Sequence, residues 1–428
     1  MNKKKLEVLT PKFASDFACI GSDCTAHCCN TWTVEVDKQT YKTLKKHGDI
    51  VIRQLASSTF KLTRKSEKDY ASIKMSNNGD CPVLDEKNLC NIHKKCGPKL
   101  LPHVCQDYPR TPRWFGEQAE MSMAISCPEV VKNVLYDPEA MMISTVTQYQ
   151  NELSHGNIRG LTAANLPTYL AFIRDFCFSI ALNSELNFEQ QLFIIGLFLK
   201  QSDSHLNNIT RLSELAENFN IMISDGTLLE HFQALPSVSA IKWHFFATQD
   251  SFFVTHIYKN KEIPTCNIKK FDDFIECQQM LMRSLNTNEA SSNNDNVFIV
   301  ANPNREHHAY TEILKISQKI IDEHLAEYPH LLNNFLLYSI YNDQFMAHLG
   351  KRPTEYFKFL ILDILMLKSY LAGIAIQQEK LTKDSVVKLF QSYFRRRQHY
   401  PGLLAFMDEK IKEAELQSEY VIFSLLKN

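Results

Sequence analysis

The spacing of cysteines constrains this chain more than any other feature of its sequence. Four thiols fall within the eleven residues from Cys19 to Cys29. Nine of the twelve cysteines lie in the first 127 residues, at Cys19, Cys24, Cys28, Cys29, Cys81, Cys90, Cys96, Cys105 and Cys127. A lone intracellular cysteine usually packs as a small buried hydrophobe, so a cluster of this density needs another physical reason.

Length and charge bound the classes of function. A chain of 428 residues can bury a substantial core and suggests two domains. Its formal net charge of −1 argues against a general affinity for nucleic acid or anionic lipid, because both partners select a basic surface. With only 12 glycines and 27 phenylalanines, the composition favours packed helices over a turn-rich β architecture.

The N-terminus and the most apolar segment of the chain predict a cytoplasmic protein with no stable membrane insertion. Residues 1–6 carry the charges of a signal peptide but have no apolar segment behind them. The apolar stretch 359–376 contains Asp363 and Lys368, whose charges would be costly in lipid, so we expect a buried helix of a soluble protein. Disulfides are disfavoured in a reducing cytoplasm, where dense thiols more often bind metal.

Local patterns predict a mainly α fold in two parts. An irregular, cysteine-rich N-terminal domain with few short strands (1–145) precedes a multi-helix C-terminal domain (146–428). In the first part we expect a strand over 31–36, a helix capped by Asp37 that stops near Gly48, and loops with short helices over 81–113, where prolines recur. In the second part we expect helices over 166–182, 187–200, 306–325, 331–345, 354–376 and 382–393.

Two finer signals lie in the second part. Asn187 and Gln190 have the spacing of a capping box. The polar run 286–296 is predicted to be an exposed loop between helical blocks.

The thiols have metal-ligand character, although their spacing fits no common motif. Soft sulfur suits both zinc and iron, and a closed site usually takes four ligands. The first four cysteines are separated by four, three and zero residues, unlike the paired C-x2-C of zinc ribbons or the ferredoxin C-x2-C-x2-C-x3-C run. Because the adjacent Cys28 and Cys29 project in different directions, one of them can serve a second site, a disulfide or the core. Iron–sulfur, zinc and redox thiols all remain open.

The order of the cysteines also carries a family resemblance. Cys19-x4-Cys24-x3-Cys28-Cys29 is followed by Cys81-x2-Leu84, Cys90-x-Ile92-His93, Cys105-x2-Tyr108-Pro109-Arg110 and Cys127-Pro128. This pattern resembles the cysteine-rich zinc- or iron-chelating family. With its long helical C-terminal part, the chain is similar to the flagellin lysine-N-methylases. Weaker matches in that part are Leu332–Phe335 to Tyr341, Ala372–Ala375 and the stretch ending at Arg395–His399.

The resemblance implies a bacterial cytoplasmic enzyme that transfers methyl groups from S-adenosyl-L-methionine to lysine side chains of flagellin. It also implies a [4Fe–4S] cluster, with zinc as the alternative, bound by cysteines of this region. The matching residues are Cys19, Cys24, Cys28, Cys29, Cys81, Cys90, Cys105 and Cys127, whereas Cys96 has no counterpart. One such cluster normally takes four thiolates, so the surplus thiols leave room for a second metal site, a disulfide or core packing.

Candidates for the catalytic chemistry are few. The chain has neither the Gly-rich loop of a Rossmann-like methyltransferase nor the radical-type C-x3-C-x2-C signature, so the methyl donor needs a less familiar site. Lysine must lose a proton before its amine can attack, which requires desolvation or a base. Asp107 and Tyr108 are candidates for that base. The competing interpretation is that both residues are structural. Arg110 is a candidate to grip the carboxylate of the methyl donor, with an internal ion pair as its alternative.

Other polar residues have more ordinary interpretations. His27 and His93 lie between cysteines and could ligate metal, but structural hydrogen bonding is favoured for each. Arg395, Arg396, Arg397 and His399 form a basic cluster, predicted to be a solvated helix end or, alternatively, a docking site for an acidic partner.

Two functions outside the methylases also fit the sequence. The first is a non-enzymatic zinc- or iron-handling protein whose helical part binds partners. The second is a thiol redox sensor without bound metal.

Overall fold

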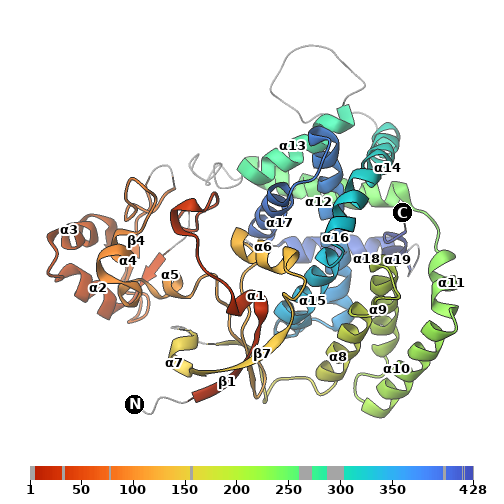
Figure 1. The fold of residues 1–428 in the computed structure, drawn as a ribbon, viewed down its shortest axis with the longest axis horizontal. Coiled ribbons are helices and arrows are strands. Elements are labelled where there is room, and N and C mark those ends of the chain that lie inside the picture. Colours follow the sequence, from red (N-terminus) through yellow and green to blue (C-terminus); the bar gives the residue numbers. More distant parts are fainter. Residues whose placement is uncertain are drawn as a thin grey trace.

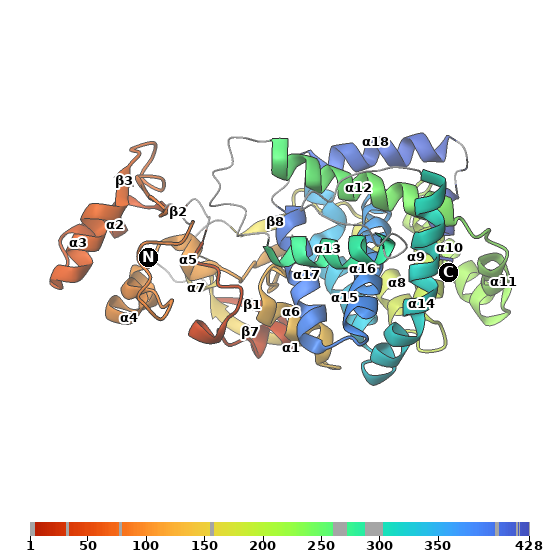
Figure 2. The ribbon, with the colours of Figure 1, turned by 90° about the horizontal axis from the view of Figure 1, so that it is seen from above.

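The computed structural model describes residues 5–30, 34–76, 79–154, 158–259, 272–286, 303–398, 402–416, 418 and 420–427. A small lobe extends to one side of a larger helical body, and a five-stranded sheet lies near their junction (Figures 1 and 2). The described structure is 62% helical, which confirms the predicted mainly α class.

The small lobe is built around a three-stranded antiparallel sheet in the order β2-β4-β3. Its elements are β2 (Val34–Val36), α2 (Lys38–Lys45), α3 (Ile50–Thr59), β3 (Phe60–Leu62) and β4 (Ala71–Ile73). Asp37 caps α2 as predicted, because its carboxylate accepts a hydrogen bond from the Thr40 amide at 2.9 Å. Strand β2 confirms the end of the predicted strand, whose residues 31–33 lie outside the described part of the chain.

The segment 81–107, whose Ile92 and Leu101 pack in the small-lobe core, is irregular, as the prolines predict. It contains only short helices, α4 (Asn91–Cys96), the 3-10 turn η2 (Pro98–Leu100) and α5 (His103–Asp107). Cys127 then stands at the N-cap of α6 (Pro128–Tyr136), whose first position is a proline.

The five-stranded sheet runs in the order β7-β1-β6-β5-β8. The strands are β1 (Lys5–Pro11), β5 (Arg113–Gly116), β6 (Gln118–Glu120), β7 (Ile143–Tyr149) and β8 (Arg159–Thr162). Strand β1 pairs in parallel with β6, where Leu9 faces Glu120, and antiparallel with β7. Because this sheet combines strands from both sides of residue 145, the division of the chain at that point stays a prediction.

The helical body confirms each of the six helices predicted for it, with small shifts of their ends. Its main helices are α8 (Leu170–Ala181), α9 (Phe188–Ser202), α10 (Ile209–Ser224), α11 (Thr227–Gln233), α12 (Ser239–Lys259), α13 (Asp272–Asn286), α14 (Pro303–Glu327), α15 (Leu331–Asp343), α16 (Pro353–Gln378), α17 (Lys383–Gln398), α18 (Leu403–Glu415) and α19 (Val421–Ser424). The capping box of Asn187 and Gln190 is present, with both hydrogen bonds at 2.9 Å. The predicted loop 286–296 lies outside the described residues after Asn286, the last residue of α13.

Helix α16 lies in the core of the helical body, and its apolar side chains are buried there. It is long and apolar enough to cross a membrane by length and composition, yet 89% of its most apolar window is buried inside the protein. The two charges that argued against a membrane span both have partners. Asp363 accepts hydrogen bonds from Tyr393 at 2.6 Å and Arg397 at 2.7 Å, and Lys368 pairs with Glu189.

Close packing of α16 against α13 depends on Gly373. A Cβ atom at this position would lie 2.5 Å from the Cα and 2.7 Å from the amide nitrogen of Leu281. Because a backbone cannot rotate away as a side chain can, Gly373→Ala is expected to destabilise the fold by about 1–3 kcal/mol. Urea unfolding measures this change. Gly48→Ala, where nothing lies within 4 Å of the new Cβ, is the control, and equal unfolding midpoints for the two variants would contradict the prediction.

Candidate metal centre

The eight predicted ligands come from four separate segments that meet at the border between the small lobe and the helical body. The segment between α1 (Lys12–Ser15) and β2 supplies four of them around the 3-10 turn η1 (Gly21–Asp23), and it lies between the lobes (Figure 1). The other four come from the loop before α4, from α5 and from the N-cap of α6: Cys81, Cys90, Cys105 and Cys127.

Backbone hydrogen bonds hold part of this set together. The Cys81 amide donates to the Cys29 carbonyl at 2.9 Å, so two segments far apart in sequence are tied directly at their cysteines. Leu84 pairs with Cys90 in a β-bridge, which closes the loop from Cys81 to Cys90. Val104, next to Cys105, packs against the same small-lobe core as Cys81 and Cys90.

The remaining thiols lie nearer the helical body. Cys127 packs against the large hydrophobic core of that body. Its thiol interacts electrostatically with Cys24 and Cys28, and Cys24 in turn interacts with Cys28 and Cys19. The structure thus brings all eight predicted cysteines into one region, with Cys28 near its middle.

Protonation differs sharply among these thiols. Burial raises the pKa of Cys81 to about 11 and those of Cys105 and Cys127 to about 12. The pKa of Cys28 falls to about 7, because its thiolate accepts a hydrogen bond from Cys29 and lies near the positive charge of Arg395. The same contact raises the pKa of Cys29. Thiolate is the ligand form, and a bound cation deprotonates the thiols that coordinate it.

This difference predicts selective alkylation of the metal-free protein. Because only the thiolate reacts, iodoacetamide is expected to modify Cys28 increasingly as the pH rises through about 7, while Cys81 and Cys127 remain protonated and unreactive. Peptide mass spectrometry across the pH range measures each site. In Arg395→Gln the onset at Cys28 should move to higher pH. Equal onsets for Cys28 and Cys127 in the unchanged protein would contradict the prediction.

Arg395 is a site residue that the sequence did not reveal. It projects from α17 of the helical body, donates a hydrogen bond to Asn30 and interacts electrostatically with Cys28, Cys24 and Tyr108. Its neighbours are also internal: Arg396 is 1% exposed and donates to the Phe253 carbonyl at 2.6 Å, and Arg397 pairs with Asp363.

The predictions of a solvated helix end and of an acidic docking site were therefore wrong for these three arginines. The partners of these arginines, Asn30, Phe253 and Asp363, lie far from them in the sequence, so the local pattern does not identify them. His399, the fourth member of that predicted cluster, lies outside the described residues.

The donor set fits a thiophilic metal. All eleven cysteines in the described part of the chain are free of disulfides. Within that part, no three histidine, cysteine or acidic side chains are already grouped closely enough to hold an ion. Coordination would require side-chain rotation, which the exposure of Cys19, Cys28 and Cys105 permits. Soft sulfur donors in this number suit zinc or iron and are unlike the oxygen ligands that magnesium and calcium select.

The catalytic candidates lie beside the thiols. The Tyr108 hydroxyl is 3.3 Å from Ser126 Oγ, and burial raises its pKa, so it remains a neutral phenol. Asp107 accepts a hydrogen bond from Ser154 at 3.0 Å. Arg110 is exposed, its guanidinium lies 5.6 Å from the centre of the Phe17 ring, and no ion pair within the described ranges includes it. The roles suggested for all three residues stay predictions.

The structure also places the two candidate histidines and Cys96. His27 Nε2 lies 3.9 Å from Asp80 Oδ1, and His93 is exposed on α4. Cys96, which had no counterpart in the cysteine pattern, has its sulfur 3.6 Å from His47 Nε2.

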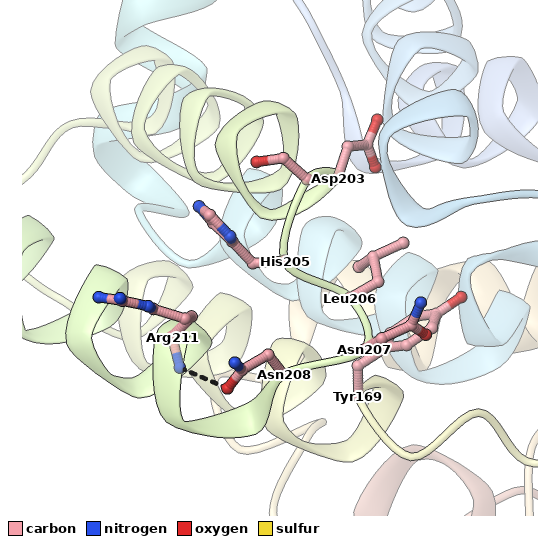
Figure 3. Close-up of a pocket in the computed structure, with 8 residues that line it drawn as sticks. Tyr169, Asp203, His205, Leu206, Asn207, Asn208 and Arg211 are labelled. Carbon is pink, nitrogen blue, oxygen red and sulfur yellow. Dashed lines mark hydrogen bonds between the residues drawn. The ribbon is translucent and has the colours of Figure 1, made fainter.

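A separate hollow of about 470 Å³ lies between α9 and α10, in a part of the helical body away from the cysteines (Figures 1 and 3). Asp203, His205 and Arg211 line it, and no sequence pattern predicts it. Its charged groups are already paired, Asp203 with Arg352 at 3.1 Å and Arg211 with Glu214 at 2.7 Å. We assign no function to this hollow.

Two protein-family models match separate parts of the chain. A model for the FliB lysine N-methylase C-terminal domain matches residues 174–425, which is more than half of the chain. A second model, for a proposed zinc- or iron-chelating domain, matches residues 18–128 and so spans all eight predicted ligands.

Comparisons with individual proteins extend over nearly the whole chain. Proteins named lysine-N-methylase from Salmonella choleraesuis (strain SC-B67) and Salmonella typhimurium (strain LT2) are each 25% identical over 402 residues, covering 92% of this chain and 93% of the relative. The flagellar biosynthetic protein FliU of Salmonella muenchen is 37% identical over 141 residues, covering 33% of this chain and 83% of that protein. No solved structure matches.

Proposed function

Because this chain belongs to the FliB lysine N-methylase family, we propose that it transfers methyl groups from S-adenosyl-L-methionine to lysine side chains of flagellin. That it is a protein-lysine N-methyltransferase rests on one observation, the match to lysine-N-methylases over 92% of its length. The methyl donor and flagellin go beyond that match. A flagellar substrate is supported by the similarity to a protein named for flagellar biosynthesis.

The metal-handling alternative is not favoured. A carrier of zinc or iron would need the cysteine-rich part alone, whereas the family match covers residues 174–425 and therefore most of the helical body. We propose that the cysteine-rich part (1–145) holds the metal, that the helical part (146–428) helps to bind the methyl donor and the protein substrate, and that the enzyme acts in the cytoplasm.

The reaction is a displacement at carbon. The lone pair of a neutral lysine amine forms a bond with the sulfonium methyl carbon, and the carbon–sulfur bond breaks with its electrons passing to sulfur. The products are S-adenosylhomocysteine and a methylated ammonium, which then loses a proton. Because free lysine is protonated at neutral pH, the enzyme must desolvate it or accept its proton before the attack.

The described residues suggest how that proton could leave. Of the two candidate bases, Asp107 is the better acceptor, since burial keeps Tyr108 in its neutral, hydrogen-bond-donating form. We propose that Asp107 accepts the lysine proton and that Tyr108 orients the amine or the methyl donor. The exposed guanidinium of Arg110 is proposed to bind the carboxylate of the methyl donor.

We propose that a [4Fe–4S] cluster, or zinc as the alternative, is bound by the N-terminal cysteines. The observation in support is the convergence of eight thiols from four segments beside Tyr108 and Arg395. When bound, this group would tie those segments together and fix the position of the neighbouring side chains.

The function is tested with methyl-labelled S-adenosyl-L-methionine, unmethylated flagellin and the protein purified without oxygen. We expect label on flagellin lysines, located by peptide mass spectrometry. Heat-denatured enzyme controls for chemical methylation, and a lysine-rich protein unrelated to flagella controls for selectivity. Label on other flagellar proteins alone would overturn flagellin as substrate, and no label on any lysine would overturn the proposed methyl donor.

A further inference from the structure

We propose that an aromatic cage in the helical body, beside the start of α17, binds a methylated lysine of the protein substrate. The rings of the cage are Tyr136, at the end of α6, His324, near the end of α14, and Tyr328, which follows α14. The side chain of Lys383, the first residue of α17, occupies the cage in this structure. The inference rests on the proposed methylation of lysine and adds a second, non-catalytic site for the substrate.

The three rings form a fixed corner. The rings of Tyr136 and Tyr328 are nearly perpendicular, at 82°, and their centres are 4.8 Å apart. The centre of the His324 ring lies 6.0 Å from that of Tyr136 and 5.1 Å from that of Tyr328. A hydrogen bond of 3.0 Å joins the Tyr136 hydroxyl to His324 Nε2, and burial lowers the pKa of His324, so its imidazole is neutral at pH 7. The corner therefore carries no positive charge that would repel a cation.

The position of Lys383 shows which chemical group fits the cage. Its ammonium nitrogen lies 4.6 Å from the centre of the Tyr328 ring and 5.3 Å from the centre of the Tyr136 ring. A cation is attracted to the face of an aromatic ring within about 6 Å of its centre. Two carboxylates stand close by, because Asp384 follows Lys383 and Glu327 accepts a hydrogen bond from the Tyr328 hydroxyl. The cage thus accepts a cation on an aliphatic stem, which is the end of a lysine side chain.

A methylated lysine can displace Lys383 from the cage. Lys383 is exposed, and no ion pair within the described ranges includes it. It also begins α17, where the helix dipole disfavours a cation. Methylation removes N–H donors that water hydrates strongly and gives the cation an apolar surface, so a methylated lysine loses less hydration when it contacts the rings. The cage therefore favours the product of the proposed reaction over an unmodified lysine.

Two helices connect the cage to the candidate metal centre. Helices α6 and α17 pack against each other (Figures 1 and 2) and run in opposite directions. Helix α6 begins after Cys127 and ends with Tyr136, whereas α17 begins with Lys383, and its Gln391 donates a hydrogen bond to the Ser126 carbonyl at 3.0 Å. At about 1.5 Å per residue, the 9 residues of α6 separate the cage from the thiols by about 13 Å.

This separation gives the cage a role in repeated methylation. About four residues of extended chain, at roughly 3.3 Å each, span the same distance. A substrate that is held in the cage by one methylated lysine can therefore present a second lysine to the catalytic candidates beside the thiols.

Calorimetric titration with short peptides tests the cage. Each peptide is centred on one lysine that carries zero, one, two or three methyl groups, and no methyl donor is added. We expect the trimethylated peptide to bind about tenfold more tightly than the unmodified one, the ratio given by one well-placed cation–π contact. Equal affinities, or no binding of any peptide, would overturn the inference. Because the titration involves no methyl transfer, such a result is distinct from failure of the proposed function, which the labelling assay reports.

Variants locate the bound peptide. Lys383→Ala removes the internal occupant and should strengthen binding of the trimethylated peptide, a gain that misfolding would not produce. Tyr328→Ala should abolish the preference for methylated peptides. Matched controls are Lys380→Ala, at another exposed lysine, and Tyr420→Ala, at a tyrosine whose ring centre is 3.9 Å from Lys200 Nζ; both should bind like the unchanged protein. Unchanged or weaker binding by Lys383→Ala, or a preference retained by Tyr328→Ala, would show that methylated lysine does not enter the cage.

Discussion

Cys28→Ser is expected to abolish stable metal binding at the candidate metal centre and to reduce methyl transfer strongly. Cys28 lies near the middle of the eight thiols, has a pKa lowered to about 7 and interacts with Cys24, Cys127, Cys90 and Cys105. Loss of an outer-shell partner typically costs roughly 10–100-fold in metal affinity or activity, and loss of a direct ligand should exceed that. Metal content per chain and the initial rate of labelling are the two measurements.

The matched control is Cys96→Ser. Cys96 belongs to the same cysteine-rich region but lies beside His47. Its replacement by serine is expected to leave the metal content and the rate of methyl transfer unchanged. Cys24→Ser and Cys105→Ser should resemble Cys28→Ser in losing metal. Full metal content and full activity in all three ligand variants would show that these thiols do not form a metal site.

Arg397→Met is expected to destabilise the helical body by about 3–5 kcal/mol, because it leaves the buried carboxylate of Asp363 without its cation. The two groups are 2.7 Å apart, with side chains 12% and 6% exposed. Burial already raises the pKa of Asp363, and Arg397 opposes that shift. A carboxyl group whose pKa is higher in the folded protein than in the unfolded chain contributes stability below the unfolded pKa, and this contribution is lost as the pH rises through the folded pKa. The loss of stability caused by Arg397→Met should therefore shrink as the pH falls and Asp363 is protonated.

Guanidinium unfolding at several pH values measures this effect. Arg211→Met removes an exposed arginine paired with Glu214 and is expected to change stability by no more than about 1 kcal/mol. The double variant Asp363→Leu/Arg397→Met should recover stability relative to Arg397→Met, because no unpaired charge remains. Unfolding of Arg397→Met at the same denaturant concentration as the unchanged protein would show that the Arg397–Asp363 pair does not stabilise the fold.

Features set by local sequence were predicted correctly. Helix α9 follows from its capping box and apolar periodicity, and α2 follows from Asp37 at its N-cap. The apolar α16 was recognised as a buried helix because the charges of Asp363 and Lys368 would be costly in lipid, and both charges have protein partners. In each case the residues that carry the signal lie within one or two helical turns of the residues whose structure they predict.

Features set by distant contacts were not predicted. Strand β1 pairs with β6, more than a hundred residues later in the chain, so neither strand has a local signal that identifies its partner. Arg395 likewise reaches Asn30 from the other end of the sequence, and its local pattern resembles that of a solvated helix end. The spacing identified the eight thiols, but their neighbours depend on the fold, which packs Cys81 and Cys90 on the small-lobe core and Cys127 on the core of the helical body.

We propose that the N-terminal thiols of this lysine methylase hold an iron–sulfur cluster. The most direct test is determination of iron, acid-labile sulfide and zinc in protein purified without oxygen, together with its visible absorption spectrum. We expect a brown protein that contains iron and sulfide in nearly equal amounts. A colourless protein that contains zinc alone would contradict the cluster.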